Sequence, residues 1–142
     1  MSQSNDSAAS AKKPWWRRWF GSRSERAAKQ FLSKLGYRIV ARNWRCKLGE
    51  LDLVAVDGDC VVFVEVRSTG GDQPDRPAES VDRLKQERLT KLAVAFMQAK
   101  RLLGRPARFD VLAVHWPADK KEPKITHYPN AFEAVGRFQM FS

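Results

Sequence analysis

The hydrophobic positions of this chain change their period several times, and each change marks an expected element. The first regular stripe has helical spacing and consists of Ala27, Ala28, Phe31, Leu32 and Leu35. Ser24 suits the N-cap of this helix, and Gly36 suits its end. The stripe therefore predicts an amphipathic helix of about three turns.

Three β-rich runs follow this helix, at residues 37–41, 51–56 and 61–67. The last two runs are separated by Asp57-Gly58-Asp59-Cys60, which is a strong hairpin signal. Residues 68–78 contain two glycines and two prolines, and we expect them to form a loop.

Helical spacing returns at about residues 82–103, and Gly104 suits the end of that helix. Residues 108–116 predict a further strand, residues 125–128 an edge strand, and the residues from Asn130 onward a short closing helix. The main order is α-β-β-β-α-β. A helix that crosses from residue 67 to residue 109 favours parallel neighbours, so we expect a mixed sheet covered by helices.

Two carboxylates stand where the strand pattern calls for apolar side chains. Asp52 is the only charge in the run 51–56, and Glu65 interrupts the apolar run 61–66. A lone charge in a buried strand costs several kcal/mol unless it is paired or metal-bound. These two residues are therefore the first candidates for a functional site.

The hairpin register decides whether these carboxylates meet. With Gly58-Asp59 as a two-residue loop, Asp52 lies directly opposite Glu65. With Asp57-Gly58 as the loop, Glu50 faces Glu65 and Asp52 is a diagonal neighbour. In either case the carboxylates share one face, about 5 Å or 7–8 Å apart at Cβ. A three-residue loop without a bulge sends Asp52 and Glu65 to opposite faces.

Two carboxylates at such a separation repel each other, and a divalent cation removes the conflict. Hard oxygen ligands suit Mg²⁺ or Mn²⁺, which keep water ligands and accept phosphate oxygens. The alternative interpretation is a structural cluster of ion pairs with Arg45, Arg67 or Lys85.

Two further side chains fit the same chemistry. Glu25 lies in the first turn of the first helix, where it can hold a metal-bound water or simply favour the helix N-terminus. Lys85 lies on the apolar face of the long helix, where it can contact a scissile phosphate or extend its amino group to solvent.

The chain has 142 residues, a net charge of +10 and a sequence pI of about 10.1. This size suits one domain, and the charge favours nucleic acid first and an anionic membrane surface second. The two cysteines, Cys46 and Cys60, form neither a disulfide scaffold nor a zinc motif. Without an apolar span or secretory signal in this sequence, we expect a cytoplasmic protein with no stable membrane insertion.

Residues 1–20 differ from the rest in composition. We expect them to form a disordered basic tail, whose Lys12-Lys13-Pro14-Trp15-Trp16-Arg17-Arg18-Trp19-Phe20 segment interleaves cations and aromatic rings. Such a segment can stack on bases, lie at lipid headgroups or cover an apolar patch of the domain. Residues 21–142 form the predicted domain.

Five segments together resemble the YraN-like proteins, an uncharacterised bacterial family of the restriction-endonuclease-like superfamily, close to archaeal Holliday junction resolvases. The resemblance covers about residues 22–135. The segments are Ser24-Glu25, Gly36-Tyr37, Asn43-Trp44-Arg45, Gly49-Glu50-Leu51-Asp52-Leu53 and Val62-Phe63-Val64-Glu65-Val66-Arg67.

The resemblance implies a three-layer α/β/α fold with Asp52 and Glu65 as metal ligands, Glu25 as an auxiliary acid and the Val66 carbonyl as a third ligand. It also implies a homodimer as a possible assembly. Arg67 occupies the position of the superfamily's lysine. An arginine stays protonated, so it can stabilise a phosphate but cannot transfer the proton of the attacking water.

The leading functional hypothesis is a Mg²⁺- or Mn²⁺-dependent nuclease that acts on DNA, with branched DNA as a candidate substrate. Its expected nucleic-acid contacts are Arg45, Arg67, Lys85 and Arg88. Its rival is a non-catalytic nucleic-acid-binding module on the same fold. A weaker alternative is a membrane-surface adaptor docked through the tail tryptophans.

Overall fold

The computed structural model describes residues 15–71, 81–119 and 121–135, with side chains from Arg23 onward. The elements follow the order α2 (Trp15–Lys34), β1 (Arg38–Cys46), β2 (Gly49–Asp57), β3 (Cys60–Gly70), α3 (Arg83–Ala99), β4 (Ala107–Trp116) and β5 (Lys124–Phe132). The first fourteen residues of the predicted tail and the loop residues 72–80 lie outside the described parts.

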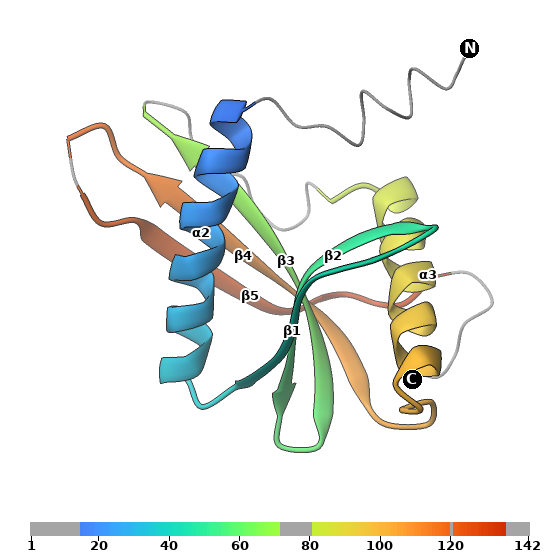
Figure 1. The fold of residues 1–142 in the computed structure, drawn as a ribbon. Coiled ribbons are helices and arrows are strands. Elements are labelled where there is room, and N and C mark those ends of the chain that lie inside the picture. The colour runs from blue at the N-terminus through green and yellow to red at the C-terminus, as the bar shows by residue number, and fades with distance from the viewer. Residues whose placement is uncertain (1–14, 72–80, 120, 136–142) are drawn as a thin grey trace, which may run out of the picture.

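The five strands form one mixed sheet in the order β1-β2-β3-β4-β5. Only β3 and β4 are parallel, and α3 connects them, as the predicted crossover requires. Helix α2 packs on one face of the sheet and α3 lies on the other (Figure 1). The chain thus has the predicted α/β architecture of a mixed sheet between helices, with β5 as an additional edge strand.

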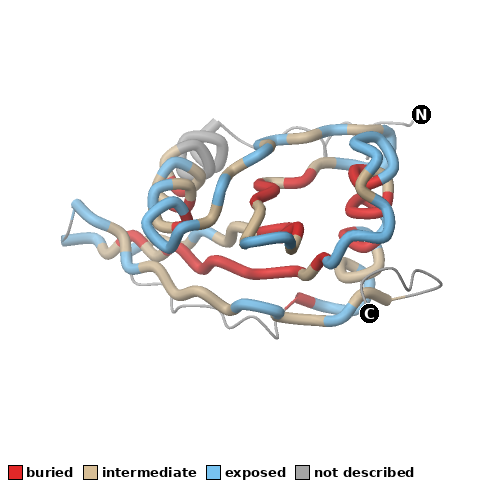
Figure 2. Tube along the Cα trace, turned by 90° about the horizontal axis from the view of Figure 1, so that it is seen from below, coloured by how far each residue is buried: buried red, intermediate tan, exposed pale blue. Residues whose placement is uncertain are grey.

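Alternate residues of the central strands supply two apolar layers. On the face toward α3, which we call the α3 face, Phe63 and Phe109 pack with Leu92, Phe96 and Met97 of the helix. On the opposite face, called the α2 face, the buried cluster consists of Ala28, Leu32, Leu53, Val62, Val64 and Leu112. Figure 2 shows this buried backbone in the middle of the molecule, between exposed outer turns.

The start of the first helix differs from the sequence prediction. Helix α2 begins at Trp15, so residues 15–20 belong to a helix and not to a disordered tail. Ser24 lies inside this helix and is not its N-cap. Its buried hydroxyl accepts a hydrogen bond from Trp116 Nε1 at 2.8 Å and pairs with Ser68 Oγ at 2.6 Å. Ser24 therefore serves to hold α2 on strands β3 and β4.

The last element also differs from the prediction. The backbone from Asn130 to Phe132 continues β5, and the described residues beyond it, up to Val135, form no helix. Asn130 has a φ of 50° and donates its N–H to Asp110 Oδ1 at 2.9 Å. That tertiary hydrogen bond holds the backbone in a bulge where the local sequence suggested a helix start.

Helix α3 begins where the sequence predicted, because Asp82 caps it by accepting the N–H of Lys85 at 2.9 Å. It ends at Ala99, a turn earlier than predicted, and Gly104 lies in the following turn with a φ of 93°. No helix in the described part of the chain is long and apolar enough to cross a bilayer.

The β1–β2 hairpin turns over partway along its length. Leu51 packs in the α3-face cluster, whereas Leu53, two residues later, packs in the α2-face cluster. A regular strand would place both on one face. Asn43, between the ladder pairs Arg42↔Leu53 and Trp44↔Leu51, has a φ of 52°, which allows this turn. Residues 44–51 form what we call the hairpin arm, which extends beside α3 (Figure 1).

Candidate active site

The register of the β2–β3 hairpin brings the two strand carboxylates to the same place. Asp57 pairs with Cys60 and Leu53 with Val64, so the loop is Gly58-Asp59, the first of the predicted alternatives. Gly58 has a φ of 64°, which suits a tight turn. Continuing this register by one residue places Asp52 opposite Glu65.

The described ladder between β2 and β3 stops at the pair Leu53↔Val64, immediately before these carboxylates. The strands separate there because the hairpin turns over at Asp52. The N–H of Val66 then donates to Asp52 Oδ2 at 2.9 Å. Asp52 thus lies at the position where β2 separates from β3, and its carboxylate contacts the backbone of β3, the strand that carries Glu65.

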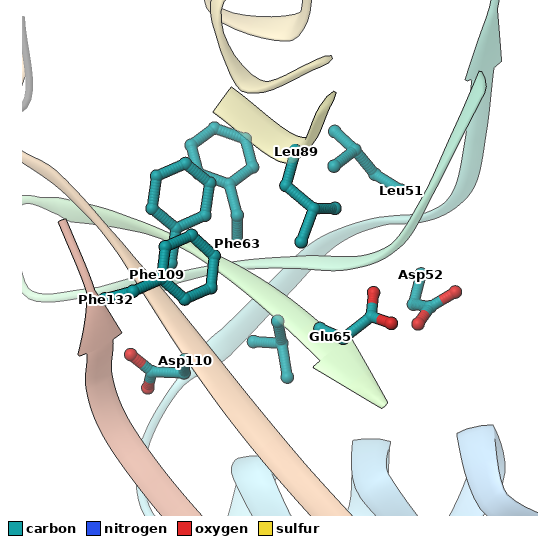
Figure 3. A pocket seen from close by; sticks show the side chains of 9 residues that line it. Leu51, Asp52, Phe63, Glu65, Leu89, Phe109, Asp110 and Phe132 are labelled. Carbon is teal, nitrogen blue, oxygen red and sulfur yellow. The ribbon is translucent and has the colours of Figure 1, made fainter. Parts of the chain in front are cut away.

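Asp52 and Glu65 line one small hollow, together with Leu51, Phe63, Val64, Leu89, Phe109, Asp110 and Phe132. Figure 3 shows the carboxylates of Asp52 and Glu65 at one end and the phenyl rings at the other. The hollow has a cavity volume of about 10 Å³, which is room for about one water molecule or ion.

Lys85 neutralises Glu65 from the first turn of α3. Its Nζ lies 2.6 Å from Glu65 Oε2, with 39% of the lysine side chain and 13% of the glutamate side chain exposed. The Asp82 cap fixes the start of α3 and therefore the direction from which Lys85 arrives. Lys85 therefore points toward the sheet and contacts Glu65 directly.

The donor set fits a divalent cation that shares its coordination sphere with solvent or substrate. No group of three or more His, Cys, Asp or Glu suitable for a metal is found among the described residues. Mg²⁺ is commonly bound by only one or two carboxylates, with waters and phosphate oxygens as its other ligands. Asp52 and Glu65 are the carboxylates that could fill that role.

Arg67 follows Glu65 by two residues on β3, so both belong to the α3 face by alternation, and it is partly buried opposite Ala113. Thr69 continues the row, and its hydroxyl lies 2.7 Å from Nδ1 of His115 on β4. The α3 face of β3 therefore changes from apolar to polar at Glu65. The polar row extends from the carboxylates toward the end of the strand.

Other predicted site residues lie apart from the hollow. Glu25 is partly buried on α2, and no residue of that helix is among the described residues that line the hollow. Arg45 is exposed on the hairpin arm, where its Nε lies 3.4 Å from Glu50 Oε2, and Arg88 is exposed on α3. The structure therefore brings together Asp52, Glu65 and Lys85, with Arg67 next along the strand.

Sequence reasoning missed Asp110, a fully buried carboxylate on β4. It accepts hydrogen bonds from Arg108 Nε at 3.0 Å, His127 Nε2 at 2.8 Å and the Asn130 N–H at 2.9 Å. Burial raises the pKa of Asp110, but these three donors together lower it more, so the pKa lies below its ordinary value. Asp110 also interrupts an apolar run, but Arg108 stands two residues earlier in the same strand, so the signal was weaker than the lone charge at Asp52.

The Asp110 network shapes one wall of the hollow. Between the pairs Phe109↔Phe132 and Val111↔Tyr128, β5 has three residues where β4 has only Asp110. Asp110 holds this bulge, after which Phe132 stacks on Phe109 with ring centroids 4.7 Å apart. Both rings line the hollow, so the buried carboxylate supports the apolar wall beside the strand that carries Glu65.

The family model and the similar proteins that match this chain all belong to one family. The model of "Uncharacterised protein family UPF0102" matches residues 24–114. A UPF0102 protein of Rhodopirellula baltica is 42% identical over 82% of this chain and 71% of its own length. A UPF0102 protein of Pelotomaculum thermopropionicum is 42% identical over 82% of this chain and 97% of its own. One of Stutzerimonas stutzeri is 46% identical over 80% of this chain and 94% of its own.

Proposed function

The chain belongs to the uncharacterised protein family UPF0102, and we propose that it is a Mg²⁺- or Mn²⁺-dependent nuclease that cleaves DNA phosphodiester bonds. One observation carries the proposal: Asp52 and Glu65 line one small hollow at the point where β2 separates from β3. The YraN-like resemblance, which concerns the same family, independently implies that these residues are metal ligands.

In this proposal Asp52 and Glu65 hold the cation. The bound cation would supply an activated water and neutralise the charge that develops on the scissile phosphate. The Val66 N–H orients Asp52, because its hydrogen bond to Oδ2 leaves the carboxylate little freedom to turn. Lys85 pairs with Glu65 in this structure, and in the proposal its amino group would donate to a phosphate oxygen when Glu65 serves as a metal ligand.

Arg67 limits the chemistry available to the protein itself. A guanidinium cannot accept a proton near neutral pH, so Arg67 acts as a donor to phosphate and not as a base. Glu25 remains the proposed auxiliary acid, and it would need a substrate or solvent link to the hollow because none of the described side chains of α2 lines it. The proposal therefore assigns the proton from the attacking water to a carboxylate or to solvent.

The direct test compares cleavage of branched and duplex DNA, with Mg²⁺ or Mn²⁺, by the wild type, Asp52→Ala and Asp59→Ala. Asp59 is an exposed aspartate of the hairpin loop and serves as the matched control. Cleavage should need the metal, disappear in Asp52→Ala and persist in Asp59→Ala, while the far-ultraviolet circular dichroism of all three agrees. Equal cleavage by Asp52→Ala and the wild type would refute the assignment.

The second candidate is a non-catalytic DNA-binding module. Two observations favour it: Glu65 already has a cationic partner in Lys85, and Arg67 stands where the superfamily has its lysine. This candidate expects salt-sensitive DNA binding and no cleavage with any divalent metal. The same assay separates the candidates, provided that binding is measured beside cleavage.

The proposal includes the cytoplasm as the location, because Cys46 and Cys60 are both free thiols and tolerate a reducing environment. It also retains the homodimer that the resemblance implies. The membrane-adaptor alternative depends on the side chains of Trp15, Trp16 and Trp19, which lie outside the described side chains. Liposome binding by a variant that lacks residues 1–20 tests it.

A further inference from the structure

The tip of the hairpin arm presents an apolar side chain to solvent. Cys46 pairs with Gly49, so Lys47 and Leu48 form the two-residue loop, and 49% of Leu48 is exposed. Neither Lys47 nor Leu48 has a positive φ, so this turn accepts most residues and does not require a leucine. Leu48 is therefore explained neither by the turn nor by the core.

The arm is held firmly by α3. The Trp44 ring meets the Phe96 ring edge to face, with centroids 5.4 Å apart, and Leu51 is buried in the same cluster. Gly49 lies beside α3, and a Cβ there would be in ordinary van der Waals contact with Leu92 Cδ1, at 3.6 Å. The Leu48 N–H donates to Cys46 Sγ at 3.4 Å. Leu48 is thus carried at the end of a braced hairpin.

Cations accompany this leucine. Arg45 and Lys47 are both exposed, and the ion pair of Arg45 with Glu50 leaves 77% of the arginine side chain in solvent. The hairpin arm carries Arg45 and Lys47 against Glu50, a net charge of +1, and Arg42 lies two residues before it. Cations that contact phosphates beside an inserted apolar side chain are the combination by which proteins kink and unstack DNA.

The tip is also close to the proposed cleavage site along the strand. Leu48 precedes Asp52 by four residues, which in extended backbone corresponds to about 13 Å. This distance is comparable with a few nucleotide steps. A DNA strand whose phosphate lies at Asp52 and Glu65 can therefore reach the tip of the same hairpin.

We propose that the hairpin arm binds DNA beside the cleavage site, with Arg45 and Lys47 on phosphates and Leu48 inserted between weakly stacked bases at a branch or strand end. Unstacking costs least where the bases are already distorted or unpaired, so this wedge favours branched DNA over continuous duplex. The inference deepens the proposed function by naming its substrate class, and it rests on that function for the identity of the polymer.

The test uses a branched DNA that carries 2-aminopurine beside the branch, with Ca²⁺ as the divalent ion. The full chain should raise the 2-aminopurine fluorescence on binding, because insertion unstacks the reporter base. Leu48→Ala should lose most of this rise and bind the branch about tenfold more weakly. Leu35→Ala, which removes a leucine 51% exposed at the end of α2, should behave like the wild type.

The cations are tested separately from the wedge. Lys47→Ala should weaken binding to branched and duplex DNA alike and reduce the magnitude of the salt slope by about one, while keeping the fluorescence rise at saturation. A full rise with Leu48→Ala overturns the proposal. A second result would also overturn it. If the wild type sediments as a dimer without DNA, and Leu48→Ala dissociates this dimer but leaves the fluorescence rise unchanged, then Leu48 is a contact between copies of the chain.

The outcomes separate this inference from the nuclease proposal. If the wild type never cleaves DNA with Mg²⁺ or Mn²⁺ but its fluorescence rise depends on Leu48, the nuclease fails and the wedge stands. If the wild type cleaves and no rise occurs on binding, the wedge fails and the nuclease stands.

Discussion

Asp110 and Glu65 show how different surroundings separate a structural carboxylate from a candidate functional one. Asp110 is fully buried and accepts hydrogen bonds from Arg108, His127 and the Asn130 amide, which together cover both of its oxygens. Glu65 faces one lysine whose side chain is 39% exposed and which can move away. A cation or phosphate site requires a partner that can be exchanged and a hollow that is accessible. Glu65 meets this requirement, whereas Asp110 is suited to stabilising the fold.

Removing the Asp110 carboxylate should destabilise the fold. Asp110→Ala leaves Arg108, His127 and the Asn130 N–H without their shared acceptor, and we expect the free energy of unfolding to fall by about 3–5 kcal/mol. Urea denaturation measures this change. Asp119→Ala, at an exposed aspartate, is the control and should leave the midpoint nearly unchanged. A small loss with Asp110→Ala would contradict the structural role.

The same carboxylate should make stability depend on acid pH. The pKa of Asp110 is lower in the folded protein than in the unfolded chain, so the unfolded chain binds the proton first and stability rises with pH. This contribution is complete above the unfolded value of about 3.9 and is lost as the pH falls through the lower folded value. Asp110→Asn should flatten the curve of unfolding free energy against pH in that acid range. Identical curves for both proteins would show that Asp110 does not titrate in this way.

Lys85 should matter for both stability and activity. Glu65 is only 13% exposed, so Lys85→Met leaves a largely buried carboxylate without its cation, and we expect the free energy of unfolding to fall by about 1–3 kcal/mol. Loss of a phosphate donor should also slow DNA cleavage by about tenfold to a hundredfold. Lys91→Met, at an exposed position of α3, is the matched control for both measurements. Unchanged cleavage by Lys85→Met would place this lysine outside the mechanism.

At the scale of elements, the β1–β2 hairpin is the piece that creates the site. Its inner half completes the sheet, and its outer half turns over at Asn43 and Asp52 to pack on α3. The separation of β2 from β3 that results leaves the Val66 N–H to be satisfied by Asp52. The carboxylate that closes the end of the ladder is thus the same carboxylate that is available to a cation.

The turn of the hairpin should depend on Asn43. Asparagine tolerates a φ of 52°, glycine adopts it without strain, and a β-branched residue resists it. We expect Asn43→Gly to change the unfolding free energy by less than about 0.5 kcal/mol and Asn43→Val to lower it by about 1–2 kcal/mol. Thermal or urea unfolding of both variants checks the difference. Equal stability of the two would show that the left-handed backbone at Asn43 is not required.

At the scale of the whole molecule, the net charge of +10 predicts how DNA is held. Each phosphate that the protein neutralises should increase the magnitude of the negative slope of log K against log salt by about 0.9 on duplex DNA. We expect a slope of several units in fluorescence anisotropy titrations between about 50 and 200 mM salt. Asp52→Ala should keep this slope, because it removes no cation. Affinity that does not change with salt would exclude the basic surface as the DNA contact.

Much of the architecture followed from the sequence alone, because it depends on local period and on turn chemistry. The β-rich runs predicted β2, β3 and β4, helical spacing predicted the start of α3, and the crossover predicted the parallel pair β3–β4. The local rules were wrong where a distant contact overrides them. Ser24 looked like an N-cap until Trp116 and Ser68 showed why it is buried, and Asn130 looked like a helix start until Asp110 held it in a strand.

By itself, the sequence determined which residues are expensive to bury, namely the lone carboxylates Asp52 and Glu65 in apolar strands. Only the tertiary structure decided which of the possible registers applies, that Lys85 reaches Glu65 from another element, and that Asp110 belongs to a saturated network. The physical reason is that the cost of burial is a property of each side chain, whereas its compensation comes from groups that lie far away along the chain.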